Sequence, residues 1–288
     1  MISPYKAAVG ACLLLTFVAH ASAQSPAPAN LPLWEVGVGA FGLTAPAYPG
    51  ADDRNNRVLP LPYLLYRGEV LRADQSGIGA RLFRSDRLEF DVGLAGALPS
   101  DSDDVEIRAG MPDLGALFEF GPRLKIRMAD IDRNSRLRAE LPLRAVIEAR
   151  GGLRRQGWTF EPKLAYETRG ERGLWSVEGN VSVVFGDKRI NRYFYEVQPQ
   201  YANAARAAYG ADAGLMLTRV GLFATRQLNP DVRLFGFVRY ESYAGSANRA
   251  SPLHLKNSGT SAGIGFAWTL ARSSRRALGY EPVDPVTP

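Results

Sequence analysis

The sequence predicts an all-β protein, a transmembrane antiparallel β-barrel of the outer-membrane type with about twelve strands. Three observations indicate this fold class. Large apolar residues alternate at period two with small or charged ones, short polar turns alternate with long connections, and aromatic residues recur near strand ends. After the N-terminal segment no stretch approaches roughly 18 consecutive apolar residues, so helical membrane spans are excluded.

The chain begins with the pattern of a secretory signal peptide over residues 1–23. Lys6 is the only charged residue before Glu35, an apolar run covers residues 7–19, and a small-x-small site precedes Gln24. We therefore expect export, with cleavage after Ala23. The single cysteine, Cys12, lies inside the apolar run, whereas the cysteine of a lipoprotein signal would end it. The mature chain is thus expected to contain no cysteine and no disulfide.

The mature chain is long enough for one large all-β domain, which we place at residues 24–270. A soluble β-sandwich also has alternating strands, but its polar face meets water and rarely concentrates Gly and Ala beside paired charges. Small and oppositely charged residues favour instead the interior of a narrow closed barrel, with the apolar parity facing lipid. The alternation is clearest at residues 34–38, 88–95, 123–128, 136–144, 158–167, 175–183 and 261–270.

The connections predict the topology. Keeping the parity requires a hairpin near Gln75-Ser76, which splits residues 69–83 into two strands and brings the count to about twelve. Ten strands is the alternative if residues 57–83 pair differently. The asymmetry between short and long connections is typical of periplasmic turns and outer loops. Short turns are expected at residues 84–87, 129–135, 168–173 and 228–231, and long ones at 44–56, 99–113, 147–156, 186–208 and 244–257.

A glycine motif near the start of the domain has two interpretations. Residues 37–42, GVGAFG, match the G-x-G-x-x-G pattern of dinucleotide sites and follow a predicted strand. Such a site requires a helix to begin there, yet the next residues contain two prolines and no helical period. We interpret the glycines as small inward-facing residues of the first strand.

One histidine is available for catalysis. His254 is the only histidine outside the predicted signal peptide, and it follows Ser251 in the segment SPLH. A lipid-modifying barrel enzyme using His254 is a remote alternative, because a base also needs an orienting partner and a nucleophile within reach. One histidine without cysteines is a poor basis for a metal centre. We therefore predict a non-enzymatic protein with no catalytic, metal or cofactor-binding residues.

The charged residues are interpreted as structural. Asp101, Asp103 and Asp104 lack the glycine and distal glutamate of a calcium-binding loop, and we interpret them as a solvated outer loop. The arginines, lysines and glutamates of the strands are predicted to face the lumen as a salt-bridge lattice, which accounts for a net charge of +6 without a basic tail. Outer-membrane lipid and lipopolysaccharide are the expected surroundings, and nucleic acid is not an expected partner.

Five segments, given in chain order at the end of this paragraph, together resemble the MipA/OmpV family of MltA-interacting outer-membrane proteins. The resemblance covers most of the mature chain, although the family's aromatic-aromatic-Gly-Val run stands here as residues 194–197, FYEV, and the chain continues beyond its last strand. The segments are WEVGVGAFGLTAPAYPGADD (34–53), LPLPYLLYRGE (59–69), GMPDLGALFEFGPRL (110–124), FGDKRINRYFYEV (185–197) and SPLH (251–254).

The resemblance implies a function that the composition does not show. It implies an outer-membrane scaffolding protein that links a murein hydrolase, a lytic transglycosylase, to a bifunctional murein synthase in peptidoglycan remodelling. Other members are described as adhesins or as proteins of osmotic and antibiotic response. A surface adhesin is therefore kept as an alternative, and the predicted charged interior of Arg, Lys and Glu keeps a small-solute outer-membrane channel as another.

The last predicted strand, SAGIGFAWTL at residues 261–270, fits the assembly signal of outer-membrane barrels. Such chains usually end on an aromatic residue, but here residues 271–288 follow, with three arginines and three prolines. A segment of this composition cannot form another strand. We predict a flexible periplasmic tail that contacts murein or a murein enzyme.

Overall fold

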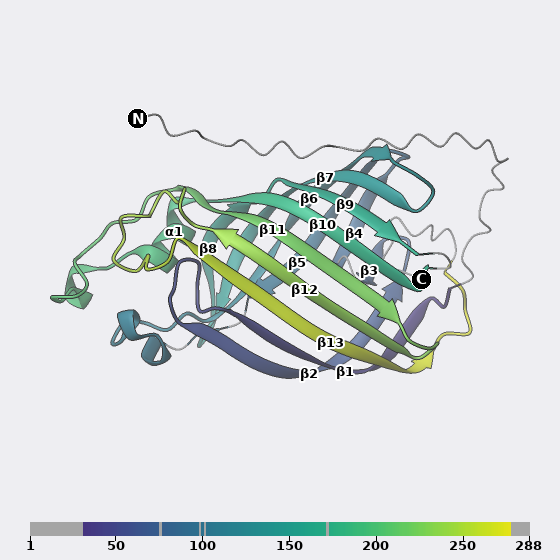
Figure 1. The fold of residues 1–288 in the computed structure, drawn as a ribbon, viewed down its shortest axis with the longest axis horizontal. Helices are drawn as coiled ribbons and strands as arrows, with labels where there is room; N and C mark the ends of the chain where they lie inside the picture. Colours follow the sequence, from purple (N-terminus) through teal and green to yellow (C-terminus); the bar gives the residue numbers. More distant parts are fainter. Residues whose placement is uncertain (1–30, 75–76, 98, 101, 171–172, 278–288) are drawn as a thin grey trace, which may run out of the picture.

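A computed structural model describes residues 31–277 except 75–76, 98, 101 and 171–172, and it shows one closed antiparallel sheet (Figure 1). The predicted signal peptide, with Cys12, lies outside the described residues. The strands are β1 (Trp34–Pro46), β2 (Arg54–Arg67), β3 (Leu71–Asp74), β4 (Gly77–Arg84), β5 (Leu88–Ala97), β6 (Ala116–Asp130), β7 (Ser135–Ala149), β8 (Leu153–Phe160), β9 (Lys163–Arg169), β10 (Trp175–Gly186), β11 (Gly214–Gln227), β12 (Val232–Ser242) and β13 (Ser258–Arg272).

The thirteen strand segments build a barrel of 12 strands, as predicted. β8 and β9 are two halves of one barrel strand, because both pair with β7 in one continuous register, from Leu143 opposite Phe160 to Glu140 opposite Lys163. The break between them contains Pro162, which has no N–H for the ladder. β13 pairs with β1 and closes the ring. β3 and β4 pair as two separate strands, which confirms the split of residues 69–83.

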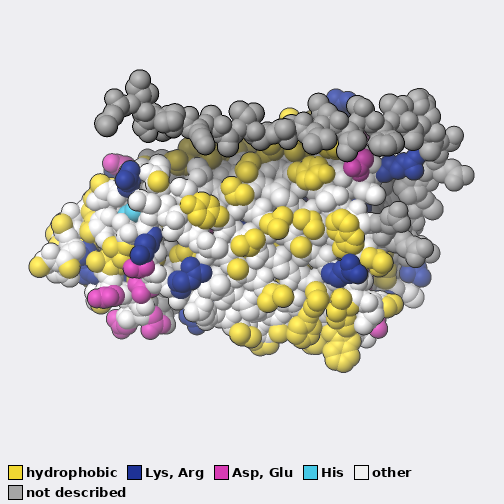
Figure 2. Space-filling model, viewed as in Figure 1, with side chains coloured by type: hydrophobic (Ala, Val, Ile, Leu, Met, Phe, Trp, Pro, Cys, Tyr) yellow, Lys and Arg dark blue, Asp and Glu magenta, His cyan; other side chains and the backbone are white. Residues whose placement is uncertain are grey.

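The predicted parity is confirmed in the strands that carry it. Phe90, Leu94 and Ile264 are exposed on the outer surface, whereas Glu89 and Asp91 are buried in the lumen. Figure 2 shows hydrophobic side chains spread over the barrel wall, with acidic side chains gathered mainly at one end. No helix among the described residues is long and apolar enough to cross a membrane.

The two ends of the barrel differ. We call the rim where β1 begins and β13 ends the turn end, and the opposite rim the loop end. Three turn-end connections lie where they were predicted, between β4 and β5, β6 and β7, and β11 and β12. At the loop end, the prediction of a long connection at residues 147–156 is wrong. β7 and β8 stay paired up to Ala149 opposite Leu153, and Gly151 and Gly152, both at positive φ, make a tight turn.

The long loops at the loop end form a folded cap, on the left in Figure 1. Its helix α1 (Lys188–Tyr195) was not predicted, because eight residues give too short a period to recognise. Asp187 caps the helix by accepting a hydrogen bond from the Ile190 amide at 3.0 Å. Short 3₁₀ turns over Ser102–Asp104, Glu106–Arg108 and Pro199–Tyr201 complete the cap.

The wall of the barrel is incomplete beside β2. Among the described residues, β2 pairs with the short β3 only through Tyr66–Ala73 and Arg67–Arg72. The amide of Arg67 donates to Leu33, on the β1 side, so the amides of even-numbered residues of β2 point the other way. Pro60 and Pro62 occupy two of these positions and therefore remove two donors from an open strand edge.

Aromatic rings occupy the space above the glycines of β13. Phe41 stacks against Phe235 with ring centroids 5.7 Å apart and against Phe237 at 6.0 Å. A Cβ atom on Gly263 would lie 2.6 Å from the Phe41 ring and 2.7 Å from the Phe237 ring. The small face of SAGIGFAWTL thus makes room for rings from the two neighbouring strands.

We predict that Gly37→Ala destabilises the barrel by about 1–3 kcal/mol, because the new Cβ would overlap the Trp268 carbonyl oxygen at the β1–β13 seam. Gly179→Ala on β10 is the matched control, since no atom lies within 4 Å of its Cβ position. The measurement is urea unfolding in micelles, followed by the gel shift between folded and boiled protein. Equal stability of the two variants would contradict a tight seam.

Candidate functional site

The lumen contains a lattice of buried ion pairs, as the sequence predicted. Glu89 accepts from Lys125 at 3.1 Å and from Arg81 at 3.0 Å. Asp91 forms a two-pronged pair with Arg123 at 2.9 and 2.7 Å. These groups come from β4, β5 and β6, whose alternate residues face the same interior. Buried charges are stable only when paired, and here each named carboxylate has a cation in contact.

Arg138 is the centre of the lattice. Its guanidinium donates to Glu140 at 2.7 Å and also to Glu167 and Glu178, which come from two further strands. Lys163 lies 3.1 Å from Glu140 and joins the same group. One cation thus neutralises carboxylates from β7, β9 and β10, so the lattice ties adjacent strands together from inside.

A second group of ion pairs lies nearer the loop end. Glu161 contacts Arg219 at 2.7 Å and Arg144 at 3.1 Å, and Arg219 also contacts Glu241 at 2.8 Å. A cavity of about 490 Å³ remains between these charges and apolar lumen residues that include Phe223 and Phe237. The interior is therefore charged on one side and aromatic on the other, with space for water or a small solute.

The segment SPLH belongs to the folded cap. The Leu253 carbonyl accepts a hydrogen bond from the Tyr48 hydroxyl at 2.7 Å, and the Leu255 amide donates to Gly50 at 2.8 Å. Gly50 has a φ of 89°, and a side chain there would lie 3.3 Å from the His254 ring. The loops 47–53 and 243–257 are thus locked together.

Ser251 and His254 are not arranged as a nucleophile and its base. The Ser251 hydroxyl donates to the Tyr195 carbonyl at 2.7 Å and accepts from the Leu253 amide at 3.1 Å. The His254 ring instead lies 6.4 Å, between centroids, from each of Tyr195 and Tyr243. Burial lowers the pKa of His254, and the Asn257 side chain opposes this shift. Ser251 is therefore bonded to the backbone of the cap, whereas the His254 ring packs near two tyrosine rings and neither of its buried nitrogens has a hydrogen-bond partner among the described residues.

The other sequence motifs also have structural positions. Gly37 and Gly39 lie within β1, where Gly42 has the opposite parity and pairs with the outward-facing Ile264. No helix follows them, which excludes a dinucleotide site. Asp103 and Asp104 are exposed in a 3₁₀ turn, and Asp101 lies outside the described residues. Within the described part of the chain, no group of three His, Cys, Asp or Glu side chains is placed to hold a metal.

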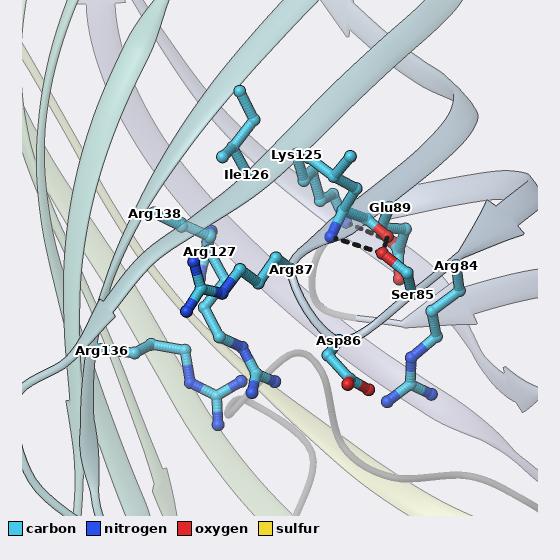
Figure 3. Close-up of a pocket in the computed structure, with 11 residues that line it drawn as sticks. Arg84, Ser85, Asp86, Arg87, Glu89, Lys125, Ile126, Arg127, Arg136 and Arg138 are labelled. Atoms are coloured by element: carbon cyan, nitrogen blue, oxygen red, sulfur yellow. Dashed lines mark hydrogen bonds and ion pairs between the residues drawn. The ribbon is translucent and has the colours of Figure 1, made fainter.

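A basic pocket of about 270 Å³ lies at the turn end (Figure 3). Of its eleven lining residues, six are Lys or Arg and two are acidic. Figure 3 shows Arg87, Arg127, Arg136 and Arg138 on one side of the pocket, with Arg84 on the other. We call these residues, together with Ser85, Asp86, Leu88, Glu89, Lys125 and Ile126, the turn-end pocket.

The sequence did not predict this pocket as a site. Its arginines lie in or beside two separate turns, RSDR at residues 84–87 and the β6–β7 connection, and the pairing of β5 with β6 brings these turns together. The detectable signal was the position of Arg84, Arg87, Arg127 and Arg136 within or beside short turns on the same rim.

Comparison with known proteins finds a family match over the barrel. The family model of MltA-interacting protein MipA matches residues 37–270. No curated protein matches the chain. Similar solved structures include a bacterial polysaccharide outer membrane secretin, with 10% identity over 83% of this chain and 99% of that chain and a TM-score of 0.42. An outer membrane channel from Pseudomonas putida F1 is 10% identical over 86% of this chain and 100% of that chain, with a TM-score of 0.35. Outer membrane phospholipase A from Escherichia coli is 10% identical over 81% of this chain and 92% of that chain, with a TM-score of 0.31.

We predict that Arg138→Met destabilises the barrel by about 3–5 kcal/mol, because it removes the cation shared by the buried Glu140 and Glu167 and the half-buried Glu178. Lys188→Met is the control, since it breaks an exposed pair with Asp212 and should cost about 1 kcal/mol or less. Urea unfolding in micelles compares the two variants. A similar loss in both would show that the lattice is not a source of stability.

We also predict that the cap loosens in acid. Because burial lowers the pKa of folded His254, the opened cap binds the proton more tightly, and cap stability falls as the pH drops below about 6.5. The protection of residues 243–257 against hydrogen exchange, measured relative to the intrinsic exchange rate at each pH, should therefore fall between about pH 7.5 and about pH 5. His254→Phe keeps a ring but cannot titrate, so its protection should lose this pH dependence. An unchanged dependence in the variant would rule out His254 as the cause.

Proposed function

We propose a function on the premise that the chain belongs to the MltA-interacting protein MipA family. The protein is a non-enzymatic adaptor of the outer membrane, which holds a lytic transglycosylase and a bifunctional murein synthase together at the periplasmic face. The observation that carries the proposal is the family match across the whole barrel, from β1 to β13. In a barrel of this type the turn end faces the periplasm and the cap faces outward.

The arrangement of polar groups supports a function in binding partners at the surface, in preference to an enzymatic function in the lumen or cap. The lumen carboxylates are engaged with cations, and Ser251 is engaged with the backbone of the cap. The turn end, in contrast, has arginines near the ends of β4, β6 and β7 and in the turn before β5, which supports contact with a partner in the periplasm. An adaptor needs only such a contact surface.

The tail is part of the proposal. Residues 273–277 are held at the turn end, where the Ala277 amide donates to the Leu31 carbonyl at 3.0 Å and Ser273 donates to Trp34 at 2.9 Å. Residues 278–288 lie outside the described residues. We propose that they reach from this anchored point toward murein or a murein enzyme.

Affinity capture from solubilised envelopes tests the adaptor function. The tagged full chain should recover a lytic transglycosylase or a murein synthase, and removal of residues 278–288 should weaken the recovery while the gel shift of the barrel stays unchanged. A boiled sample of the same chain is the control for unspecific adhesion. Repeated recovery of neither enzyme would refute the adaptor, and recovery unaffected by the deletion would reduce the tail to a spacer.

A small-solute channel is the second candidate, because the lumen cavity of about 490 Å³ borders on charged groups. We expect no steady conductance in planar bilayers, since the cap lies at the loop end and the paired charges narrow the lumen. Steady single-channel steps would favour the channel. Removal of cap residues 187–213 is the comparison, and it should raise conductance if the cap limits entry.

A further inference from the structure

We propose that the lumen cavity of about 490 Å³ binds a small aromatic carboxylate, with Arg239 as the residue that holds its anionic group. This inference goes beyond the proposed adaptor function and does not rest on it, because the cavity lies inside the barrel. It is supported by the contacts of Arg239, by the aromatic rings beside it and by the space between them.

Arg239 is a lumen residue of β12 that the ion-pair lattice does not engage. It has the same parity as Phe237 and Glu241, and Glu241 is bonded to Arg219 at 2.8 Å. In the described part of the chain, the Arg239 guanidinium forms no hydrogen bond or ion pair. It lies over the Phe237 ring instead, with its central carbon 4.6 Å from the ring centroid. Stacking of this kind orients the guanidinium and leaves the N–H groups in its plane for an acceptor.

The carboxylates that line the cavity differ from Arg239 in this respect, because each of them is in contact with a cation. An incoming cation would therefore compete with a side chain of the protein at every one of these carboxylates, whereas an anion can bind Arg239 without displacing a partner. The contacts are Glu119 with Arg144 at 3.6 Å, Glu140 with Arg138 at 2.7 Å, Glu161 with Arg219 at 2.7 Å and Glu178 with Arg138 at 2.5 Å.

Aromatic rings form the part of the cavity next to Arg239. Phe223 on β11 is the register partner of Phe237 on β12, and both line the cavity. Phe237 is held from behind by Phe41, with ring centroids 6.0 Å apart. Gly221 is the register partner of Arg239 and has no side chain, so the cavity extends to the guanidinium. A flat ring can stack on the phenylalanines while its carboxylate forms two parallel hydrogen bonds with Arg239.

The size of the cavity fits a small molecule. Its volume of about 490 Å³ lies within the range of roughly 300–1,000 Å³ that is usual for small-molecule sites. A ligand of one or two rings can be enclosed, whereas a folded protein domain cannot. A saturated acid of the same size could also pair with Arg239, but it would gain nothing from ring stacking. The arrangement therefore favours an aromatic acid.

Isothermal titration calorimetry with the full chain in zwitterionic micelles tests the site, with protein-free micelles as the blank. The probe is naphthoate, naphthamide is its neutral match, and decahydronaphthoate is its saturated match. Arg239→Gln should weaken naphthoate binding about ten-fold or more, because a charge-assisted pair is lost. Arg226→Gln is the matched control. It removes the same charge from an exposed position opposite the outward-facing Leu234, and it should change binding less than about two-fold.

Phe223→Leu is a second cavity variant, which keeps every charge and keeps the test valid if Arg239→Gln does not fold. It should weaken naphthoate binding about two- to ten-fold and change decahydronaphthoate binding less than about two-fold. The gel shift confirms folding of each variant. Absence of saturable naphthoate binding, equal binding of naphthamide, or equal weakening by Arg239→Gln and Arg226→Gln would overturn the site. Binding of decahydronaphthoate as tight as that of naphthoate would overturn the preference for an aromatic ligand.

Discussion

The requirement that every backbone group in a membrane be paired within the protein shapes this structure more than any other. A sheet in lipid has no water at its edges, so β13 must meet β1 and close the ring. At the seam the backbone of β13 comes so close that Gly37 and Gly39 leave no space for a side chain. The first two glycines of the segment that resembles a nucleotide motif are therefore a consequence of closure, whereas Gly42 has room for a side chain.

Closure also determines the chemistry of the interior. A ring of 12 strands encloses little space, and alternate residues of every strand point into it. The protein fills that space in two ways, with crossing ion pairs centred on Arg138 and with stacked rings around Phe41. Both use up the interior for stability, which leaves the cap and the turn end as the surfaces on which partners can be met.

Much of this architecture was predictable from the sequence because lipid, lumen and strand period impose the same alternation. Residues 261–270 are the clearest case, with each bulky residue outside and each small residue inside. The cap helix was missed because eight residues are too few to show a helical period in the sequence. The short turn at Gly151-Gly152 was missed because it depends on the pairing of β7 with β8, which the local sequence does not reveal. The turn-end pocket was missed for another reason. Its arginines are about forty residues apart in the chain, and strand pairing alone makes them neighbours.

The open edge of β2 gives the barrel an uneven stiffness. A complete ring resists lateral pressure around its whole circumference, but in the described part of the chain β2 pairs with β3 only near the turn end. Toward the loop end, the edge of β2 that faces β3 carries Pro60 and Pro62. These prolines lack the N–H groups that complete pairing with another strand would need. The described residues show two register pairs at the β2–β3 seam and ten at the β1–β13 seam, so fewer backbone hydrogen bonds resist separation of β2 from β3.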